Sequence, residues 1–155
     1  MIDINGYSTD LRAARLSNFT NRPFEFDNVP CVGIEGILQS LKCPDPEIQK
    51  EICALRGREA KRKGAEFNNW KESQILWWQG RPFHRSSREY IELITRIYDS
   101  VFSQDTTFAS DLLSTGYEDI RHTIGNPDMR DTVLTEVEMI HQLNRLRIKV
   151  LGDHR

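Results

Sequence analysis

Three polar residues in one short segment have types and spacing that suit acid-base chemistry. Glu35, Gln39 and Lys42 lie within residues 34–42, among apolar residues at helical spacing. At 100° per residue, the three side chains form a narrow stripe at the border of the apolar face. Burial at such a border raises the pKa of a carboxyl group and lowers the pKa of an amine. The stripe is therefore a candidate active site.

The spacing within the stripe limits how its members can interact. Glu35 and Lys42 are seven residues apart, which places their Cα atoms roughly 10 Å apart along a helix axis. A direct ion pair of the i to i+4 type is excluded, and Gln39 lies between the two charges. Its amide can donate to the carboxylate or accept from the ammonium, and a small substrate could span the same gap. The alternative is an ordinary amphipathic helix whose long border side chains reach water.

The stripe must be positioned by the segment that carries it and by the hairpin before it. Residues 34–42 are expected to form a helix with an apolar face made of Ile34, Ile37, Leu38 and Leu41. A small hairpin is predicted over residues 23–32, where apolar residues alternate around the turn pair Asp27-Asn28. Pro30 has no amide hydrogen to donate, which places its strand at an edge.

Further helices are predicted from capping and termination signals. Ser/Thr/Asp caps, early acidic residues and terminal glycines mark where helices begin and end. An alternation at the N-terminus also weakly favours a short strand. The expected elements are a strand near Ile2, Ile4 and Tyr7, a helix from Asp45 closed by Gly57, a basic helix 58–64, a helix after a capping box at 86–89, a helix from Asp105 to Gly116, and a helix from a capping box at 135–138 to Gly152.

These elements predict a mostly helical α+β fold, a single domain over residues 1–155 with a small antiparallel β element near the N-terminus. The long helix after residue 89 is expected to be the main core helix, with Tyr90 and Ile94 on its buried face. The C-terminal helix is expected to bury Met139, Leu143, Leu146 and Val150. All three tryptophans fall within residues 65–85 and are interpreted as core, although one could stack on a flat base.

Composition narrows the function classes. The 155 residues carry a net charge of −2, so strong non-specific binding to nucleic acid is not expected. No segment has the length of a membrane span and no leader is visible, which predicts a soluble, cytoplasmic protein. The three cysteines lack metal spacing and are expected to be reduced core thiols. No metal site or cofactor is predicted, since the histidines are dispersed at His84, His122, His141 and His154.

Six short motifs, in order, resemble the signature of the NADAR (YbiA-like) family. Each is weak alone, but their common order over residues 16–147 makes coincidence unlikely. The matching elements are Leu16-Ser17-Asn18-Phe19, Pro23-Phe24, Glu35-x-x-x-Gln39-x-x-Lys42, Glu59-Ala60-Lys61-Arg62-x-Gly64, Phe102-Ser103-Gln104 and Leu112-Leu113-Ser114-Thr115-Gly116.

The resemblance implies an N-glycosidic bond hydrolase that removes ADP-ribose from a modified nucleobase, with guanine in nucleic acid as the expected base. ADP-ribose, a ribosylated base, and ADP-ribosylated DNA or RNA are the implied partners. Glu35, Lys42 and Asp128 are then the expected catalytic residues. The expected ligand-binding residues are Ser17, Asn18, Phe19, Gln39, Trp78, Gln104, Thr115, Gly116 and His122. Cleavage through an oxocarbenium-like state needs a carboxylate near C1 and a proton for the leaving base.

The chain departs from the family pattern in several places. It has Ser100-Val101 where the family carries Ala-Lys, and Asp105 where the family carries Asn after Phe102-Ser103-Gln104. The family has a D-x-x-W-G element before the last helix, and the matching stretch, residues 128–132, keeps Asp128 and lacks the Trp-Gly pair. Trp77 or Trp78 could supply the missing ring. Two alternative functions stay open, an N-glycosidase acting on ribosylamine phosphate intermediates of the riboflavin pathway and a non-catalytic ADP-ribose or NAD sensor. An interaction module without a nucleotide ligand is the simplest alternative.

Overall fold

The computed structural model describes residues 1–152, so the last three residues of the predicted domain, with His154, lie outside the described residues. The predicted fold class is confirmed, because helices dominate and the strands form only small two-stranded sheets. The helices are α1 (Leu11–Arg15), α2 (Ile34–Ser40), α3 (Pro46–Cys53), α4 (Gly57–Gly64), α5 (Trp70–Ser73), α6 (Arg88–Gln104), α7 (Thr106–Ser114) and α8 (Glu136–Leu151).

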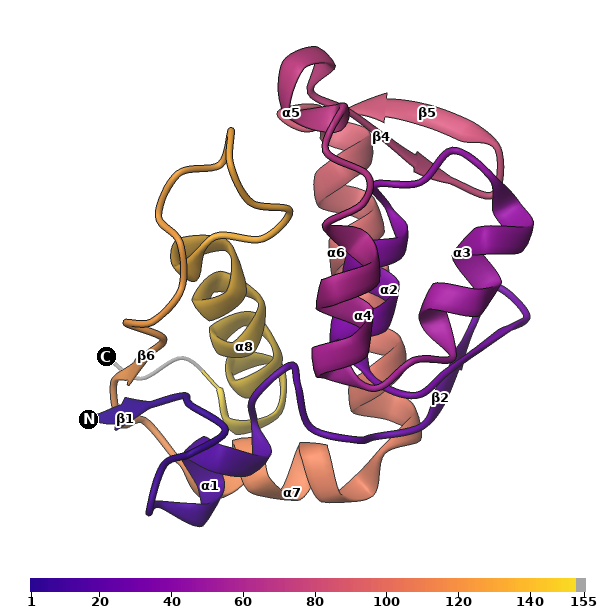
Figure 1. The fold of residues 1–155 in the computed structure, drawn as a ribbon. Helices are drawn as coiled ribbons and strands as arrows, with labels where there is room; N and C mark the ends of the chain where they lie inside the picture. The colour runs from indigo at the N-terminus through magenta and orange to yellow at the C-terminus, as the bar shows by residue number, and fades with distance from the viewer. Residues whose placement is uncertain (153–155) are drawn as a thin grey trace.

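Figure 1 shows two groups of elements on either side of the long helix α6. The chain ends, with α1, α7 and α8, form one group, and α2 to α5 with two hairpins form the other. The strands are β1 (Ile2–Asp3), β2 (Phe24–Phe26), β3 (Val29–Cys31), β4 (Ile75–Trp78), β5 (Arg81–His84) and β6 (Ile120–Arg121). β1 pairs parallel with β6, while β2–β3 and β4–β5 are antiparallel hairpins.

The predicted hairpin before the stripe is confirmed as β2–β3. Its turn residues Asp27 and Asn28 both have positive φ, at 47° and 66°, a conformation that asparagine and aspartate tolerate best among non-glycine residues. Pro30 is exposed and lies opposite Glu25, as expected for an edge strand. On the other edge, the side-chain amide of Gln104 accepts from the backbone N of Glu25 and donates to its carbonyl. Gln104 thus completes the backbone bonding of β2.

Several sequence expectations are wrong, and one hairpin was not predicted. The helix predicted over residues 34–42 ends at Ser40, so Lys42 follows it. The helix after Asp45 ends at Cys53, and Gly57 instead begins α4. The helix α6 is capped by the Ser87 hydroxyl alone, which accepts from Tyr90 N, so no capping box forms there. The segment interrupted by Gly80 is a hairpin, β4–β5, and its tight turn has Gly80 at φ 85°. Val150 is 54% exposed and does not belong to the core.

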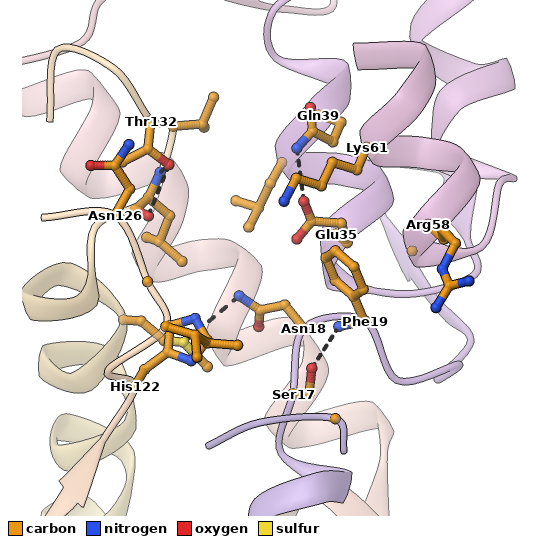
Figure 2. Close-up of a pocket in the computed structure, with 18 of the residues that line it drawn as sticks. Ser17, Asn18, Phe19, Glu35, Gln39, Arg58, Lys61, His122, Asn126 and Thr132 are labelled. Carbon is orange, nitrogen blue, oxygen red and sulfur yellow. Dashed lines mark hydrogen bonds between the residues drawn. The ribbon is translucent and has the colours of Figure 1, made fainter. Parts of the chain in front are cut away.

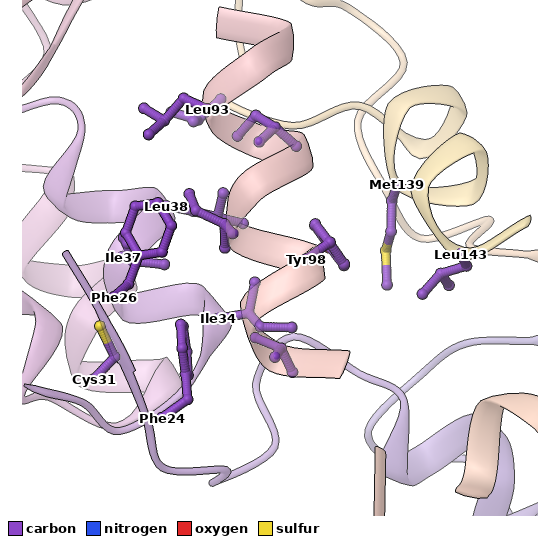
Figure 3. Close-up of a cluster of buried hydrophobic side chains, with 14 of the residues drawn as sticks. Phe24, Phe26, Cys31, Ile34, Ile37, Leu38, Leu93, Tyr98, Met139 and Leu143 are labelled. Atoms are coloured by element: carbon purple, nitrogen blue, oxygen red, sulfur yellow. The ribbon is translucent and has the colours of Figure 1, made fainter. Parts of the chain in front are cut away.

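The expected core is otherwise confirmed around α6. The apolar side chains of α2 and the β2–β3 hairpin contact one face of α6, and those of α8 lie on the other side (Figure 3). The Thr135 capping box is present, since the Thr135 hydroxyl accepts from Glu138 N and the Glu138 carboxylate accepts from Thr135 N. The three cysteines are free thiols and buried. Central buried residues include Phe26, Ile34, Ile37, Leu38, Ile94, Ile97, Tyr98, Val101, Met139 and Leu143.

Helix α2 is enclosed on more sides than its amphipathic pattern indicates. The four predicted apolar residues are at most 3% exposed, but Gly36 and Ser40 on the other side are also buried. A Cβ built on Gly36 would lie 3.1 Å from the carbonyl oxygen of Ile52 on α3. A Cβ on Gly64 of α4 would lie 2.0 Å from Gln39 Oε1. Glycines therefore allow α3 and α4 to approach α2 closely, which forces the polar stripe into protein surroundings.

Within residues 1–152, no helix combines the length and apolar character that crossing a membrane requires. The same part of the chain contains no group of three His, Cys, Asp or Glu side chains positioned to hold a metal ion.

Candidate active site

The polar stripe of α2 opens onto a pocket of about 880 Å³. One wall is formed by α2, α4 and the segment 17–20 after α1, and the opposite wall by the loop from β6 to α8 (Figure 2). A pocket of this size is at the upper end of the range that binds small ligands. Of the predicted site residues, it collects Ser17, Asn18, Phe19, Glu35, Gln39, Lys42 and His122.

Glu35 lies against the core at the base of the pocket. Its Oε1 accepts a 2.7 Å hydrogen bond from Gln39 Nε2, which confirms the predicted contact within the stripe. Desolvation by burial raises the pKa of the Glu35 carboxyl group, while the bond from Gln39 and the charges of Lys61 and Lys42 oppose that rise. The net direction is upward. Glu35 therefore keeps a proton to higher pH than an ordinary glutamate, as a general acid requires.

Lys42 follows α2 and lines the same pocket. Desolvation by burial lowers the pKa of its ammonium group, and the charge of Glu35 partly opposes this effect. Lys42 forms no ion pair within the described residues. An amine whose pKa is lowered in this way is more readily deprotonated and can act as a nucleophile.

The segment after α1 forms the part of the pocket wall that adjoins Glu35. Asn18 is fixed by the Tyr98 hydroxyl, which donates to its Oδ1 at 3.0 Å, and its carbonyl accepts from Glu35 N at 3.1 Å. The Ser17 hydroxyl accepts from Phe19 N at 3.2 Å, and the Phe19 ring remains 42% exposed. The motif 17–19 thus links the beginning of α2 to the core helix α6.

His122 faces the stripe from the opposite wall. Its Nδ1 lies 2.8 Å from the carbonyl oxygen of Ile4, and because a carbonyl only accepts, Nδ1 carries the hydrogen. Its backbone N donates to Glu136 Oε2 at 2.6 Å. A Cβ on Gly125 would lie 2.6 Å from the His122 ring, so this glycine allows the loop to fold over the imidazole. The bond to Ile4 thus fixes the orientation of the ring through Nδ1.

The structure does not bring Asp128 to the pocket. Asp128 is exposed, and its carboxylate accepts from Arg130 N within its own turn. Asp131 lines the pocket instead, where it forms an ion pair of 2.9 Å with Lys71 and accepts from Asn126 at 3.0 Å. Counting from Asp128 in the D-x-x-W-G pattern, Asp131 stands where the tryptophan would be.

Four more of the expected ligand-binding residues lie elsewhere and have structural contacts. Trp78 is 7% exposed, packs against Phe26 with ring centroids 5.6 Å apart and ring planes tilted by 44°, and donates to Asp27 at 2.8 Å. Gln104 completes β2, as described above. The Thr115 hydroxyl accepts from Arg147 at 3.1 Å, and Gly116, at φ 57°, ends α7 in a turn. Neither tryptophan of the pair 77–78 lines the pocket, so neither replaces the missing ring.

Sequence reasoning missed several polar residues of the pocket. Arg56, Arg58 and Lys61 come from α4 and its N-cap, and Lys71 comes from α5. The strongest available signal was the Glu59-Ala60-Lys61-Arg62 motif, which was identified as part of the family resemblance but contributed no residue to the expected site. Nothing in the local pattern of 126–132 distinguishes Asp131 from Asp128, because only the turn decides which carboxylate points inward.

Comparisons with known proteins agree with this fold. Residues 10–148 match the family described as bacteriophage protein GP30.3. The chain is 35% identical over 133 residues to an uncharacterized 17.1 kDa protein in the Gp30-rIII intergenic region of Enterobacteria phage T4, covering 85% of this chain and 88% of that protein. It is also similar to the NMR structure of the E. coli protein YbiA, with a TM-score of 0.64, 23% identity, and coverage of 100% of this chain and 92% of that one. The predicted YbiA-like fold is confirmed.

Proposed function

The chain belongs to the bacteriophage GP30.3 family and shares the fold of YbiA, and from this premise we propose that it is an N-glycosidic bond hydrolase of the NADAR type. The substrate is a nucleobase, with guanine expected, that carries ADP-ribose. The observation that carries the proposal is the placement of Glu35 and Lys42 in one pocket, with their pKa values shifted toward each other by burial. A carboxylic acid and an amine of this kind supply the proton transfer that base departure needs.

In direct hydrolysis, the bond between ribose C1 and the base nitrogen breaks with its electron pair on nitrogen. Protonated Glu35 donates a proton to that nitrogen, which makes the base a neutral leaving group. A water oxygen then bonds to C1 and returns a proton to the Glu35 carboxylate. Gln39, 2.7 Å from Glu35, orients the carboxyl group throughout.

A covalent route uses the same pocket and differs at Lys42. The neutral amine bonds to C1 while protonated Glu35 gives its proton to the departing base nitrogen, and the Lys42 nitrogen then returns a proton to the Glu35 carboxylate. The C1–O4 bond of the ring breaks as the remaining proton on the lysine nitrogen moves to O4, which leaves a Schiff base between C1 and that nitrogen. Water adds to this imine and releases the sugar and the amine. Atoms and charges balance in both routes without an oxidant or a reductant.

The test is turnover of guanosine carrying N-linked ADP-ribose, followed by chromatography of the released ADP-ribose. Glu35→Gln and Lys42→Met keep side-chain size and should still bind ADP-ribose, yet lose about 10² to 10⁴ in rate. Lys42→Arg separates the routes, because arginine keeps the charge but does not deprotonate. Partial activity supports direct hydrolysis, whereas complete loss with borohydride trapping at Lys42 in the wild type supports the Schiff base.

A ribosylamine phosphate of the riboflavin type should be assayed in parallel, since the same groups could cleave its N-glycosidic bond. The non-catalytic sensor is favoured by one observation, the replacement of Trp-Gly by Asp131-Thr132. A thermal shift with ADP-ribose distinguishes it, because ligand at 100 times its Kd adds about 2.7 kcal/mol to stability. Stabilisation without release of any product would replace the enzyme by the sensor. Turnover by both Glu35→Gln and Lys42→Met at the wild-type rate would contradict the proposed mechanism.

A further inference from the structure

Tyr98 is a fully buried tyrosine of α6 that bonds to the pocket wall from behind and belongs to none of the sequence motifs. Its hydroxyl donates to Asn18 Oδ1 at 3.0 Å. Burial raises the pKa of Tyr98, and the bond to Asn18 opposes that rise only in part. The hydroxyl therefore keeps its hydrogen near neutral pH and remains a donor to Asn18.

Asn18 connects this hydroxyl to the pocket and to Glu35. Asn18 lines the pocket, and its backbone carbonyl accepts from Glu35 N at 3.1 Å. The N-cap of α2 is Gly33, which has no side chain to cap the helix, so the Asn18 carbonyl takes up one of the free amides of the first turn. Asn18 and Glu35 are therefore held side by side before any ligand binds.

The bond from Tyr98 decides which end of the Asn18 amide faces the pocket. With Oδ1 bonded to Tyr98, Nδ2 is directed toward the opposite wall beside His122 (Figure 2). Its contact within residues 1–152 is a weak one, to Met139 Sδ at 3.8 Å. The reverse orientation would place an acceptor against a sulfur that has no hydrogen to donate, and the Tyr98 hydrogen would lose its acceptor. An amide N–H donor therefore faces the pocket.

We propose that Tyr98 is a positioning residue, which fixes the Asn18 amide so that Nδ2 donates to the C2 hydroxyl of the ribose that is cleaved from the base. This inference rests on the proposed function. Because Asn18 lies beside Glu35, its amide faces the two oxygens next to C1, which are the ring oxygen and the C2 hydroxyl. The ring oxygen becomes positive in an oxocarbenium-like state, so a donor there would oppose the reaction, whereas a hydrogen bond to the C2 hydroxyl strengthens in that state.

The first experiment measures turnover of ADP-ribosylated guanosine by Tyr98→Phe, by Asn18→Ala and by the double variant. Tyr98→Phe should lower kcat by about 2- to 10-fold, the value of one hydrogen bond, and leave KM near the wild-type value. In the Asn18→Ala background the same change should cost nothing further, because Tyr98 acts through the Asn18 amide. Single losses that multiply in the double variant would overturn the proposal.

The matched control is Tyr90→Phe, which removes another buried hydroxyl of α6. That hydroxyl donates to the carbonyl of Val133 at 2.6 Å and has no bond to Asn18. Any change in kcat that Tyr90→Phe causes should therefore be the same factor in the wild-type and Asn18→Ala backgrounds. A thermal melt of each variant shows that it is folded at the assay temperature.

A substrate analogue identifies the ribose oxygen. In this analogue, the ribose that is cleaved from the base lacks its C2 hydroxyl. Wild type, Tyr98→Phe and Asn18→Ala should all cleave it with the same kcat, because the acceptor of the Asn18 amide is gone. A loss in Tyr98→Phe that persists on the analogue would overturn the assignment of the C2 hydroxyl.

The Asn18 amide can also be observed without turnover. Its two side-chain N–H resonances in a nitrogen–proton correlation spectrum of the free protein are identified by their absence in Asn18→Ala. Tyr98→Phe should shift them and Tyr90→Phe should not, and unchanged resonances in Tyr98→Phe would overturn the positioning role. Absence of turnover in the wild type would reject the hydrolase, and this spectrum would still decide whether Tyr98 positions Asn18.

Discussion

Two pairs of ionisable residues, Arg85–Glu138 and Glu35–Lys42, lie near the loop from β6 to α8. They differ in how many hydrogen bonds and ion pairs compensate the burial of their charges. Arg85 is fully buried, donates to the carbonyl of Thr132 at 2.9 Å, and forms a two-bond pair with the Glu138 carboxylate. Burial opposes ionisation of Glu138, but the bonds from Arg85 hold its pKa below the ordinary value. In the stripe, burial instead raises the pKa of Glu35, and no cation lies within ion-pair distance among the described residues.

The difference separates a structural cluster from a reactive one. Arg85 and Glu138 neutralise each other, and the bonds from Arg85 favour the ionised form of the Glu138 carboxyl group. Glu35 and Lys42 each bear the cost of burial with incomplete compensation, which keeps proton exchange available. The structural pair also fixes Thr132 and the start of α8, which together hold the loop that forms one wall of the pocket. The Arg85–Glu138 pair thus holds the wall that faces Glu35 and Lys42.

The largest effect is expected from breaking the structural pair. Arg85→Met removes the cation and leaves Glu138 without its partner, which should destabilise the protein by about 3 to 5 kcal/mol. Urea unfolding followed by tryptophan fluorescence measures this change. Arg88→Met, three residues away and 90% exposed at its side chain, should change the midpoint little. A similar midpoint for both variants would show that the Arg85 pair does not hold the wall.

A smaller effect is expected where α4 contacts the stripe. Gly64→Ala would place its methyl 2.0 Å from Gln39 Oε1 and 2.9 Å from Gln39 Cβ, so α4 must shift away from α2. We expect destabilisation by about 1 to 3 kcal/mol and lower turnover, because Gln39 no longer orients Glu35. Gly6→Ala is the control, since its methyl would meet Ser17 Oγ at an ordinary 3.6 Å. Wild-type stability and turnover in Gly64→Ala would mean that the close approach is dispensable.

Removing the buried acid should stabilise the protein, in contrast to the first two changes. Because burial raises the pKa of Glu35, the folded protein holds this proton to higher pH than the unfolded chain does. Stability is therefore lost as pH rises above the pKa of the unfolded state, until the folded pKa is passed. Glu35→Gln should raise Tm near pH 8 and change it much less near about pH 4, where the carboxyl group is protonated in both states. A Tm gain that is equal at both pH values would contradict the burial of a charged Glu35.

The smallest effect is expected at the exposed pair across the pocket mouth. Lys71 and Asp131 are 43% and 54% exposed at their side chains, so solvent screens their attraction. Lys71→Ala should change Tm no more than Lys50→Ala does, a control that breaks the exposed pair with Glu47. Differential scanning fluorimetry at low and high salt compares the two. A loss as large as that of Arg85→Met would erase the distinction between exposed and buried pairs.

Sequence reasoning was most accurate where local physics decides. The periodicity of α2, the turn at Asp27-Asn28 and the caps at Asp45 and Thr135 are set by residues close together in the chain, and the structure confirms them. It was less accurate for polar residues whose partners are distant. Gln104 was predicted to contact a ligand, but its side-chain amide bonds the backbone of Glu25 on β2, 79 residues away.

Distant contacts also explain why the predictions for Trp78 and Asp128 as site residues are wrong. Trp78 packs in the core because a hairpin, which the glycine and proline of residues 80–82 concealed, turns it toward Phe26. Asp131 rather than Asp128 enters the pocket because of the turn that precedes α8. Side-chain direction in a loop depends on the complete tertiary structure, and neighbouring residues of the same type give no indication of it.

The parallel pairing of β1 with β6 has a kinetic consequence. Ile2 aligns with Ile120, and the carbonyl of Ile4 holds the His122 ring across 118 residues of chain. Contacts this distant in sequence require closure of a long loop and form late, whereas the local contacts of α2, α3 and α4 can form early. During synthesis, the first strand must wait unpaired until residues beyond 120 have left the ribosome. Glu35 and Lys42 are therefore translated well before His122, which faces them across the pocket. The site becomes complete only when the two ends of the chain meet.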